Sequence, residues 1–495
     1  MSARPLPTGT PAGEGVDAQG VHAFLDALET SPGTTPHGLM ILRHGKVVAD
    51  GWWAPYTADR PQLLYSLSKS FTSAAAGLAV GEGLLDLDAP VLSYFPELDA
   101  DITDPRSRAM LVRHIASMSS GHLAETWEQA FAEGEDEPVR GFLRIPPDRD
   151  PGTVFAYNQP TTYTLAAIIQ RLTGQRLTEY LRPRLLDPLG IGPITWQHDR
   201  LGRELGFSGL FAATDAVARL GQLHLQGGRW DGRQLLPAAW VAEATRPHVA
   251  NPLMHSPDWQ QGYGFQFWMS RHGYRGDGAF GQYLLVLPEH DAVIAMTSET
   301  QDMRAVLDTV WEHLLPAFGP GPFADAEKDD EALRARLDAL AVAPLPGPAT
   351  PADPGAWYGA PFLPAADPTA GPGTDATPGD VGLTAVALAP LPDGGWTLTL
   401  TESGGDLVLR HGAPGWTVTE RPEAPVPVAV DGGWTDAGTF TADLLFLETP
   451  HRLSLTCSLP ARTFAVRWHT KTLNWTALRE HGVPAERRPN SSRST

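Results

Sequence analysis

The chain has 495 residues, of which 42% are hydrophobic and 19% charged, so it is long enough for two domains and wholesale disorder is excluded. Its 37 basic and 57 acidic residues give a formal net charge of −20, which argues against nucleic acids and anionic membranes as partners. Cys457 is the only cysteine, which excludes an internal disulfide and a cysteine-rich metal site.

The N-terminal segment, residues 1–19, is polar and rich in proline and glycine, and we expect it to be flexible. It has no charged start followed by an apolar stretch, as a secretory signal peptide would have. No later run reaches the ~20 apolar residues of a membrane-spanning helix. These features predict a cytoplasmic protein.

Residues 20–325 are expected to form one α+β domain. The patterns of helix and strand come in this order: a short amphipathic helix at 21–28, a hairpin with a glycine turn at 39–49, helical patterns from 66 to 225, and strands at 263–270, 282–287 and 292–297. Early and late strands around a helical middle predict one sheet built from both ends of the domain. A helical subdomain is inserted between its halves.

A second domain is expected after a connecting segment at 326–380, which contains a linker rich in proline and glycine. Short alternating segments bounded by turn residues at 381–480 predict a small all-β, barrel-like domain. Residues 481–495 are expected to be a tail. This domain could shape a cleft or mediate association into a homo-oligomer, and the sequence leaves both open.

The pair Ser66 and Lys69 is the first candidate for chemistry. On a helical wheel, Leu67, Phe71, Ala74 and Leu78 form one apolar stripe. Ser66 and Lys69 share a different face, one turn apart. A lysine whose pKa is lowered by desolvation can remove the proton from a serine hydroxyl and make it a nucleophile. The alternative is an ordinary helix cap beside a solvated lysine, since Ser-x-x-Lys is common by chance.

The run from Tyr65 to Val91 resembles the first motif of the class C β-lactamase-like serine hydrolases. That family includes β-lactamases, D,D-peptidases, esterases, D-amino-acid amidases and nylon-oligomer hydrolases. The resemblance continues at 111–121, 151–158 and 221–228 and covers roughly residues 20–315. It implies a β-lactamase/transpeptidase-like antiparallel sheet flanked by helices, with Ser66 as nucleophile and Lys69 as its partner.

The resemblance places a second motif at Tyr157. It implies that this tyrosine shares proton transfer with the lysine and gives a proton to the leaving group. Family members often carry an asparagine two positions later, whereas here Asn158 comes one place early and Gln159 occupies the expected position. We expect both to bind substrate. Helix capping by Asn158 and Gln159, or a core role for Tyr157, is the alternative.

A third motif is expected in residues 272–283, where the family usually has a lysine on the strand opposite the serine. No lysine occurs there, and His272 and Arg275 are the available substitutes, with Arg275 the predicted substrate-binding residue. The segment is closer to the Gly-x-Gly-x-x-Gly-Gln form of esterase-like and amidase-like relatives. The missing lysine argues against β-lactam turnover in particular.

The oxyanion of the reaction requires backbone N–H groups rather than a side chain. We expect them from Ser66 and from the strand at Asp277 and Gly278. Glycines at 276 and 278 would permit the close approach that this requires. An ordinary hairpin turn is the alternative.

The resulting prediction is a serine hydrolase acting on a small ester, amide or D-amino-acid peptide. Lys69, assisted by Tyr157, deprotonates Ser66, and water clears the acyl-enzyme. No metal or organic cofactor is expected, and the spacings of His114, His122 and His224 match no ligand pattern. The alternative function is a catalytically silent binding or regulatory protein that retains the penicillin-binding fold.

Overall fold

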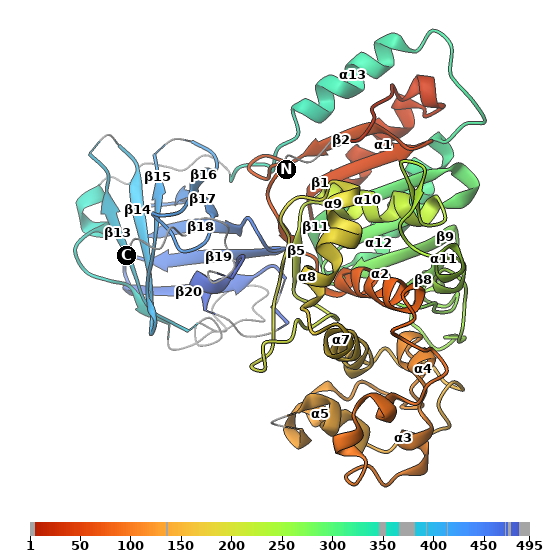
Figure 1. Ribbon diagram of the computed structural model, residues 1–495. Coiled ribbons are helices and arrows are strands. Elements are labelled where there is room, and N and C mark those ends of the chain that lie inside the picture. Colours follow the sequence, from red (N-terminus) through yellow and green to blue (C-terminus); the bar gives the residue numbers. More distant parts are fainter. Residues whose placement is uncertain are drawn as a thin grey trace, which may run out of the picture.

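The computed structural model describes residues 5–134, 137–345, 353–365, 382–392, 394–412, 414–470, 472–473 and 477–484. Most of the expected linker and tail therefore lies outside the described residues. Figure 1 shows a sheet wrapped by helices, a helical cluster below it, and a separate group of C-terminal strands on the left. Within the described residues, no helix is both long enough and apolar enough to cross a membrane.

The central sheet has six antiparallel strands in the order β2-β1-β11-β10-β9-β8. Their bounds are β1 Thr34–Arg43, β2 Lys46–Trp52, β8 Trp268–Ser270, β9 Gly273–Gly278, β10 Gln282–Leu287 and β11 Ala292–Thr300. The first two strands come from the start of the domain and the others from its end. This confirms the α+β class and the prediction that both ends build the sheet.

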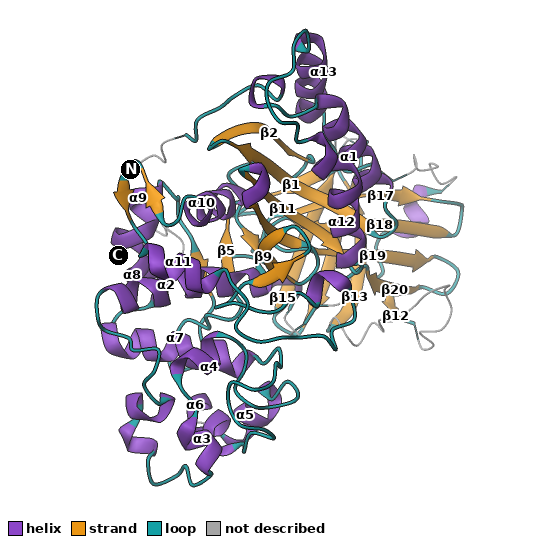
Figure 2. Ribbon diagram, turned by 90° about the vertical axis from the view of Figure 1, so that its right-hand side faces the viewer, coloured by secondary structure: helices purple, strands orange, loops and turns teal. Residues whose placement is uncertain are grey.

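Helices cover both faces of this sheet, because its strands are apolar on both sides. On one face Leu39, Leu285 and Ile294 pack with α1 (Ala18–Thr30) and α12 (Met303–Thr309). On the other face Met40 and Leu284 pack with α2 (Ser68–Gly81) and α10 (Thr214–Leu225). Figure 2 shows the sheet between these two groups of helices.

The predicted helical subdomain lies beyond α2 and is joined to it by α7. Its helices are α3 Pro105–Ala109, α4 Val112–Ala116, α5 Trp127–Glu133 and α6 Pro138–Arg144, and α7 Gln159–Thr173 lies between them and α2. The two helices that follow, α8 Leu177–Leu181 and α9 Asp187–Leu189, lie beside α2 and α10 instead. α7 begins with Pro160 in its first turn and ends at Gly174, which has a φ of 65°. Both ends follow the local signals of the sequence.

The remaining strands and α-helices of this part of the chain are short, apart from α13. They are β3 Gln62–Leu63, β4 Thr195–Trp196, β5 Leu210–Ala212, β6 Arg229–Trp230, β7 Arg233–Gln234, α11 Ala238–Ala244 and α13 Glu327–Asp338. The strand expected at 263–270 is limited to β8. Before it, Gln266 has a φ of 65° and bonds to α4 and α7 through Ala116 and Thr162, which turns the chain out of the sheet.

The C-terminal β-domain, residues 363–468, encloses its own apolar core. Its strands are β12 Leu363–Pro364, β13 Leu383–Pro390, β14 Trp396–Glu402, β15 Gly405–His411, β16 Thr417–Thr419, β17 Val428–Trp434, β18 Thr439–Phe446, β19 His451–Ser458 and β20 Thr463–Trp468. They form two sheets, β12-β20-β19-β18-β17-β16 and β13-β14-β15, which a bridge between Phe362 and Val386 connects at one edge. Across the described strands the ladders do not close into the barrel that we expected.

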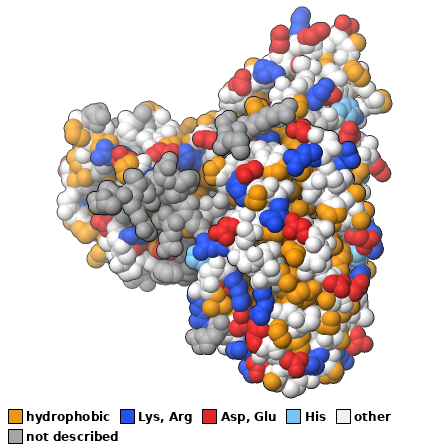
Figure 3. Space-filling model, in the orientation of Figure 1, with side chains coloured by type: hydrophobic (Ala, Val, Ile, Leu, Met, Phe, Trp, Pro, Cys, Tyr) orange, Lys and Arg blue, Asp and Glu red, His pale blue; other side chains and the backbone are white. Residues whose placement is uncertain are grey.

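Charged side chains of both signs are mixed over the face shown in Figure 3, without a continuous basic patch on that face. This agrees with the net charge of −20. A basic stripe is what a nucleic-acid-binding surface would display.

Candidate active site

Ser66 lies on a 3-10 turn, Tyr65–Leu67, that leads directly into α2. The turn follows β3, which pairs with β5. Ser66 is half-buried and lines a cleft of about 640 Å³. Its hydroxyl is therefore open to the cleft, at the end of α2 where the helix dipole favours negative charge.

Lys69 is the buried partner of Ser66. Its Nζ donates to Ser66 Oγ at 3.1 Å, to Gln159 Oε1 at 2.6 Å and to the carbonyl of Phe207 at 2.9 Å. Burial lowers the pKa of Lys69 to about 7, while the carboxylates of Glu125 and Asp277 oppose this shift. A substantial fraction of the amine is therefore unprotonated at neutral pH and able to accept a proton.

Tyr157 completes the group around the serine hydroxyl. Its ring centre lies 4.8 Å from Lys69 Nζ, and its ring stacks on Trp268 with centroids 5.2 Å apart. Burial, followed by the charge of Asp277, raises the pKa of Tyr157, and a hydrogen bond with Ser66 only partly offsets this. The phenol is therefore neutral at physiological pH and can donate its proton.

The two residues after Tyr157 occupy different places. Gln159 lines the cleft and accepts the hydrogen bond from Lys69. Asn158 is fully buried, and its Oδ1 accepts from the backbone N–H of Thr126 at 2.8 Å and from its hydroxyl at 3.0 Å. Asn158 thus anchors the loop before α5 and is absent from the described cleft lining.

Glu125 is a site residue that the sequence reasoning missed. Its carboxylate accepts from the backbone N–H groups of Thr126, Trp127 and Gln159, so it faces the starts of both α5 and α7. Desolvation raises the pKa of Glu125, and Lys69 is the charge that counteracts this. No motif marks Glu125, because only the packing of the helical subdomain brings it near the lysine.

The third motif includes β9, which lies directly against the turn that carries Ser66. A Cβ on Gly276 would be 2.4 Å from Ser70 Oγ, and one on Gly278 would be 2.1 Å from the carbonyl oxygen of Leu64. Only glycine fits at these contacts. The backbone at 276–278 is therefore brought close to the N-terminal end of α2.

Arg275 and His272 lie away from the cleft. Arg275 is fully buried, donates to Asp277 Oδ2 at 3.1 Å and to the carbonyl of Asp258 at 2.8 Å, and is 4.4 Å from the ring centre of Trp259. His272 lies in the turn between β8 and β9, 4.9 Å from the ring of Trp311. Neither takes the place of the missing lysine in this structure.

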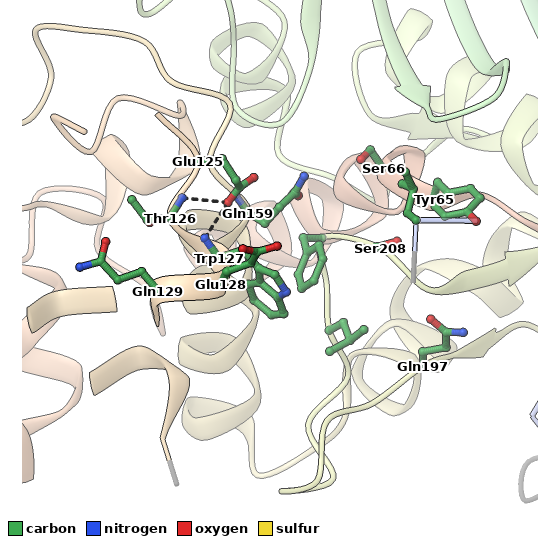
Figure 4. Close-up of a pocket in the computed structure, with 13 residues that line it drawn as sticks. Tyr65, Ser66, Glu125, Thr126, Trp127, Glu128, Gln129, Gln159, Gln197 and Ser208 are labelled. Atoms are coloured by element: carbon green, nitrogen blue, oxygen red, sulfur yellow. Dashed lines mark hydrogen bonds between the residues drawn. The ribbon is translucent and has the colours of Figure 1, made fainter. Parts of the chain in front are cut away.

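Figure 4 shows the cleft, with Ser66 on one side and the loop that carries Glu125 on the other. The aromatic rings of Trp127 and Phe207, with centroids 4.4 Å apart, form part of its wall. Glu128 adds a second carboxylate, and Leu473 comes from beyond the C-terminal β-domain. Among the described residues that line the cleft, none is a lysine or an arginine.

His, Cys, Asp and Glu side chains do not gather in groups of three that could hold a metal anywhere in the described part of the chain. His122 and His224 are buried. His122 contacts Ser120 and the carbonyl of Ile145, and His224 contacts the carbonyl of Leu220. These contacts give both histidines a place in the protein core.

Comparison with known proteins shows the family of the chain. The family model described as Beta-lactamase matches residues 24–316, more than half of the chain. The 6-aminohexanoate-dimer hydrolase of Paenarthrobacter ureafaciens is 26% identical over 292 residues, which are 54% of this chain and 74% of that protein. The lovastatin esterase of Penicillium rubens is 29% identical over 168 residues, 30% of this chain and 42% of the esterase.

Solved structures share the fold. The "Putative 6-aminohexanoate-dimer hydrolase from Bacillus anthracis" has a TM-score of 0.51 and 22% identity, and the match covers 63% of this chain and 87% of that one. These findings confirm the family resemblance seen in the motifs. The chain belongs to the Beta-lactamase family of serine hydrolases.

Proposed function

We propose that the protein hydrolyses small esters or amides through an acyl-enzyme on Ser66. One observation carries the proposal: Lys69 Nζ lies 3.1 Å from Ser66 Oγ in a buried position where the pKa of the lysine is about 7. A neutral amine within hydrogen-bond distance can take the serine proton as the oxygen attacks.

In the proposed acylation step, Ser66 Oγ forms a bond to the carbonyl carbon while its proton moves to Lys69. The carbonyl oxygen becomes negative and is stabilised by backbone N–H groups of Ser66 and of the strand at Asp277 and Gly278. The bond to the leaving group then breaks, and the leaving group takes a proton from Tyr157, which Lys69 replenishes. Water then attacks the carbonyl carbon of the acyl-enzyme, and the same residues transfer the protons. The bond to Ser66 Oγ breaks, which frees Ser66.

The acidic side chains that line the cleft favour the binding of substrates that have no carboxylate beside the scissile bond. Glu125 and Glu128 line it, and no lysine or arginine does among the described lining residues. A β-lactam, or a peptide with a free carboxylate next to the scissile bond, would be repelled there. Neutral esters and amides, and D-amino-acid amides with a free amine, fit better, in line with relatives named as an esterase and a 6-aminohexanoate-dimer hydrolase.

Kinetics with a p-nitrophenyl ester, a D-alanyl anilide and nitrocefin test this proposal. We expect turnover of the ester and the anilide that is lost in Ser66→Ala, and a kcat/KM on nitrocefin lower by roughly tenfold or more. Preferred hydrolysis of nitrocefin would contradict the substrate class. A folded protein without any Ser66-dependent turnover would favour the silent binding protein instead.

A further inference from the structure

The C-terminal β-domain holds the segment that leads into the nucleophile. The backbone N–H of Leu63 donates to the carbonyl of Glu448 at 2.9 Å, and Gln62 Nε2 donates to the carbonyl of Leu447. One residue before the nucleophile, the hydroxyl of Tyr65 lies 2.6 Å from Nε2 of His451. The turn between β18 and β19 is thus attached to the chain just ahead of Ser66.

Tyr65 has an unusual backbone conformation for a residue with a side chain. Its φ is 46°, in the left-handed region that bulky residues rarely occupy. Its ring is buried and lies edge-on to both Phe280 and His451. Such a conformation persists only where the surroundings hold it, and here it sets the direction of the Ser66 N–H and hydroxyl.

His451 is itself fixed by contacts that lead back to the catalytic sheet. Its Nδ1 lies 3.2 Å from the carbonyl of Thr470 and 3.1 Å from its hydroxyl. Thr470 Oγ1 in turn donates to Glu299 Oε1 at 3.0 Å, and Glu299 belongs to β11. If Nδ1 carries the proton and donates to Thr470, Nε2 is the acceptor for the hydroxyl of Tyr65.

Charge on His451 is disfavoured in this environment. Burial, together with the neighbouring His481, lowers the pKa of His451 well below its usual range, and burial raises the pKa of Tyr65. Both groups are neutral at physiological pH. The contact is therefore a directional hydrogen bond between neutral groups, suited to holding a position rather than transferring charge.

We propose that His451 of the C-terminal β-domain is a positioning residue for the Ser66 nucleophile, acting through the hydroxyl of Tyr65. The inference rests on the proposed function, because the proposed function assigns Ser66 its catalytic role. It makes the two domains one catalytic unit. Leu473, which follows the C-terminal β-domain in the chain, also lines the cleft. Loss of the hydrogen bond should slow acylation while leaving substrate binding nearly unchanged.

Three variants of the full chain test the inference: His451→Phe, Tyr65→Phe and the double variant. We expect each single variant to lower the rate of fluorophosphonate labelling and kcat for an ester by about ten- to a hundredfold, with KM nearly unchanged. The double variant should be no slower than either single one, because both remove the same bond. His451→Gln, whose amide oxygen can accept in place of Nε2, should recover most of the rate.

His411→Phe is the matched control. His411 is also a buried histidine of the C-terminal β-domain, stacked on Trp396 and 3.2 Å from Asp431. Its substitution should leave the labelling rate unchanged. Folded His451→Phe and Tyr65→Phe that label at the wild-type rate would overturn the inference. If His451→Phe fails to fold, Tyr65→Phe, which removes a single oxygen atom, decides the question. A wild-type protein that does not label at all contradicts the proposed function instead.

Discussion

The amine of Lys69 lies 4.8 Å from the centre of the Tyr157 ring. The same amine donates to Ser66 Oγ, and the effect of Ser66 on the Tyr157 phenol is to lower its pKa, against the larger effect of burial. A base with a lowered pKa and a phenol with a raised pKa thus meet at one hydroxyl group. In the mechanism that we propose, this pairing would assign proton removal to Lys69 and proton donation to Tyr157.

The first prediction concerns the pH dependence of the reaction. Because burial lowers the pKa of Lys69 to about 7, kcat/KM should rise with pH through about 7 as the amine loses its proton. Lys69→Ala should lower kcat by about 10²- to 10⁴-fold, and Lys69→Arg should be similarly impaired because arginine keeps its proton. A flat profile between pH 5 and 9 in wild type would speak against Lys69 as the base.

Glu125→Gln should shift the dependence of kcat/KM on pH toward lower pH. The carboxylate of Glu125 raises the pKa of Lys69, so its neutralisation should lower the apparent pKa, while the glutamine oxygen can still accept from the backbone of α5 and α7. Glu133→Gln, the same change at an exposed position of α5, is the control and should leave the profile in place. The measurement is kcat/KM against pH for the three proteins, and an alkaline shift in Glu125→Gln would contradict the assignment.

Tyr157→Phe should affect amides more than activated esters. An amine leaving group needs a proton, whereas p-nitrophenolate leaves without one, so loss of the phenol should slow anilide hydrolysis by about 10²- to 10⁴-fold and ester hydrolysis much less. Tyr180→Phe removes a hydroxyl that bonds to Glu82 far from the site and serves as the control. Equal losses on both substrates would show that Tyr157 does not act on the leaving group.

Glu299 should make stability depend on pH. Burial raises the pKa of Glu299 from 4.5 to about 7, against the smaller effects of Thr470 and Arg452. Between these pH values the folded protein keeps a proton that the unfolded chain has lost. The contribution of Glu299 to stability is therefore fully present below pH 4.5 and is lost as the pH rises through 7.

Glu299→Gln should remove this dependence. Relative to wild type, the variant should gain about 3 kcal/mol of stability between pH 4.5 and 8, at ~1.4 kcal/mol per pKa unit. Urea unfolding at both pH values measures the change, with the exposed Glu331→Gln as control. A difference between variant and wild type that stays constant with pH would mean that Glu299 is ionised in the folded protein.

Local signals in the sequence predicted much of the fold. The hairpin of β1 and β2 and both ends of α7 follow from turn and capping residues. The apolar stripe of α2 places Phe71 and Ala74 in the core. The prediction of a strand at 263–270 was wrong over most of its length, because Gln266 forms hydrogen bonds with α4 and α7 instead of a neighbouring strand. Such long-range contacts leave no periodic signal.

In the candidate site too, the sequence predicted the residues that lie in local motifs and missed those brought in by long-range packing. Motif spacing identified Ser66, Lys69 and Tyr157, which the structure brings together, although their catalytic roles stay predictions. Glu125 reaches the lysine only through the packing of the helical subdomain, and His451 lies 386 residues from Tyr65 in sequence. No spacing rule connects residues so far apart. The cytoplasmic location and any homo-oligomer also stay predictions.

The central claim is that Ser66 is the nucleophile that carries the acyl group. Incubation with a fluorophosphonate, followed by intact-mass and peptide mass spectrometry, tests it most directly. We predict one adduct per chain, located on Ser66, formed faster above pH 7 than below it and absent from Ser66→Ala. An adduct on another residue, or an unmodified Ser66 in folded protein, would contradict the account.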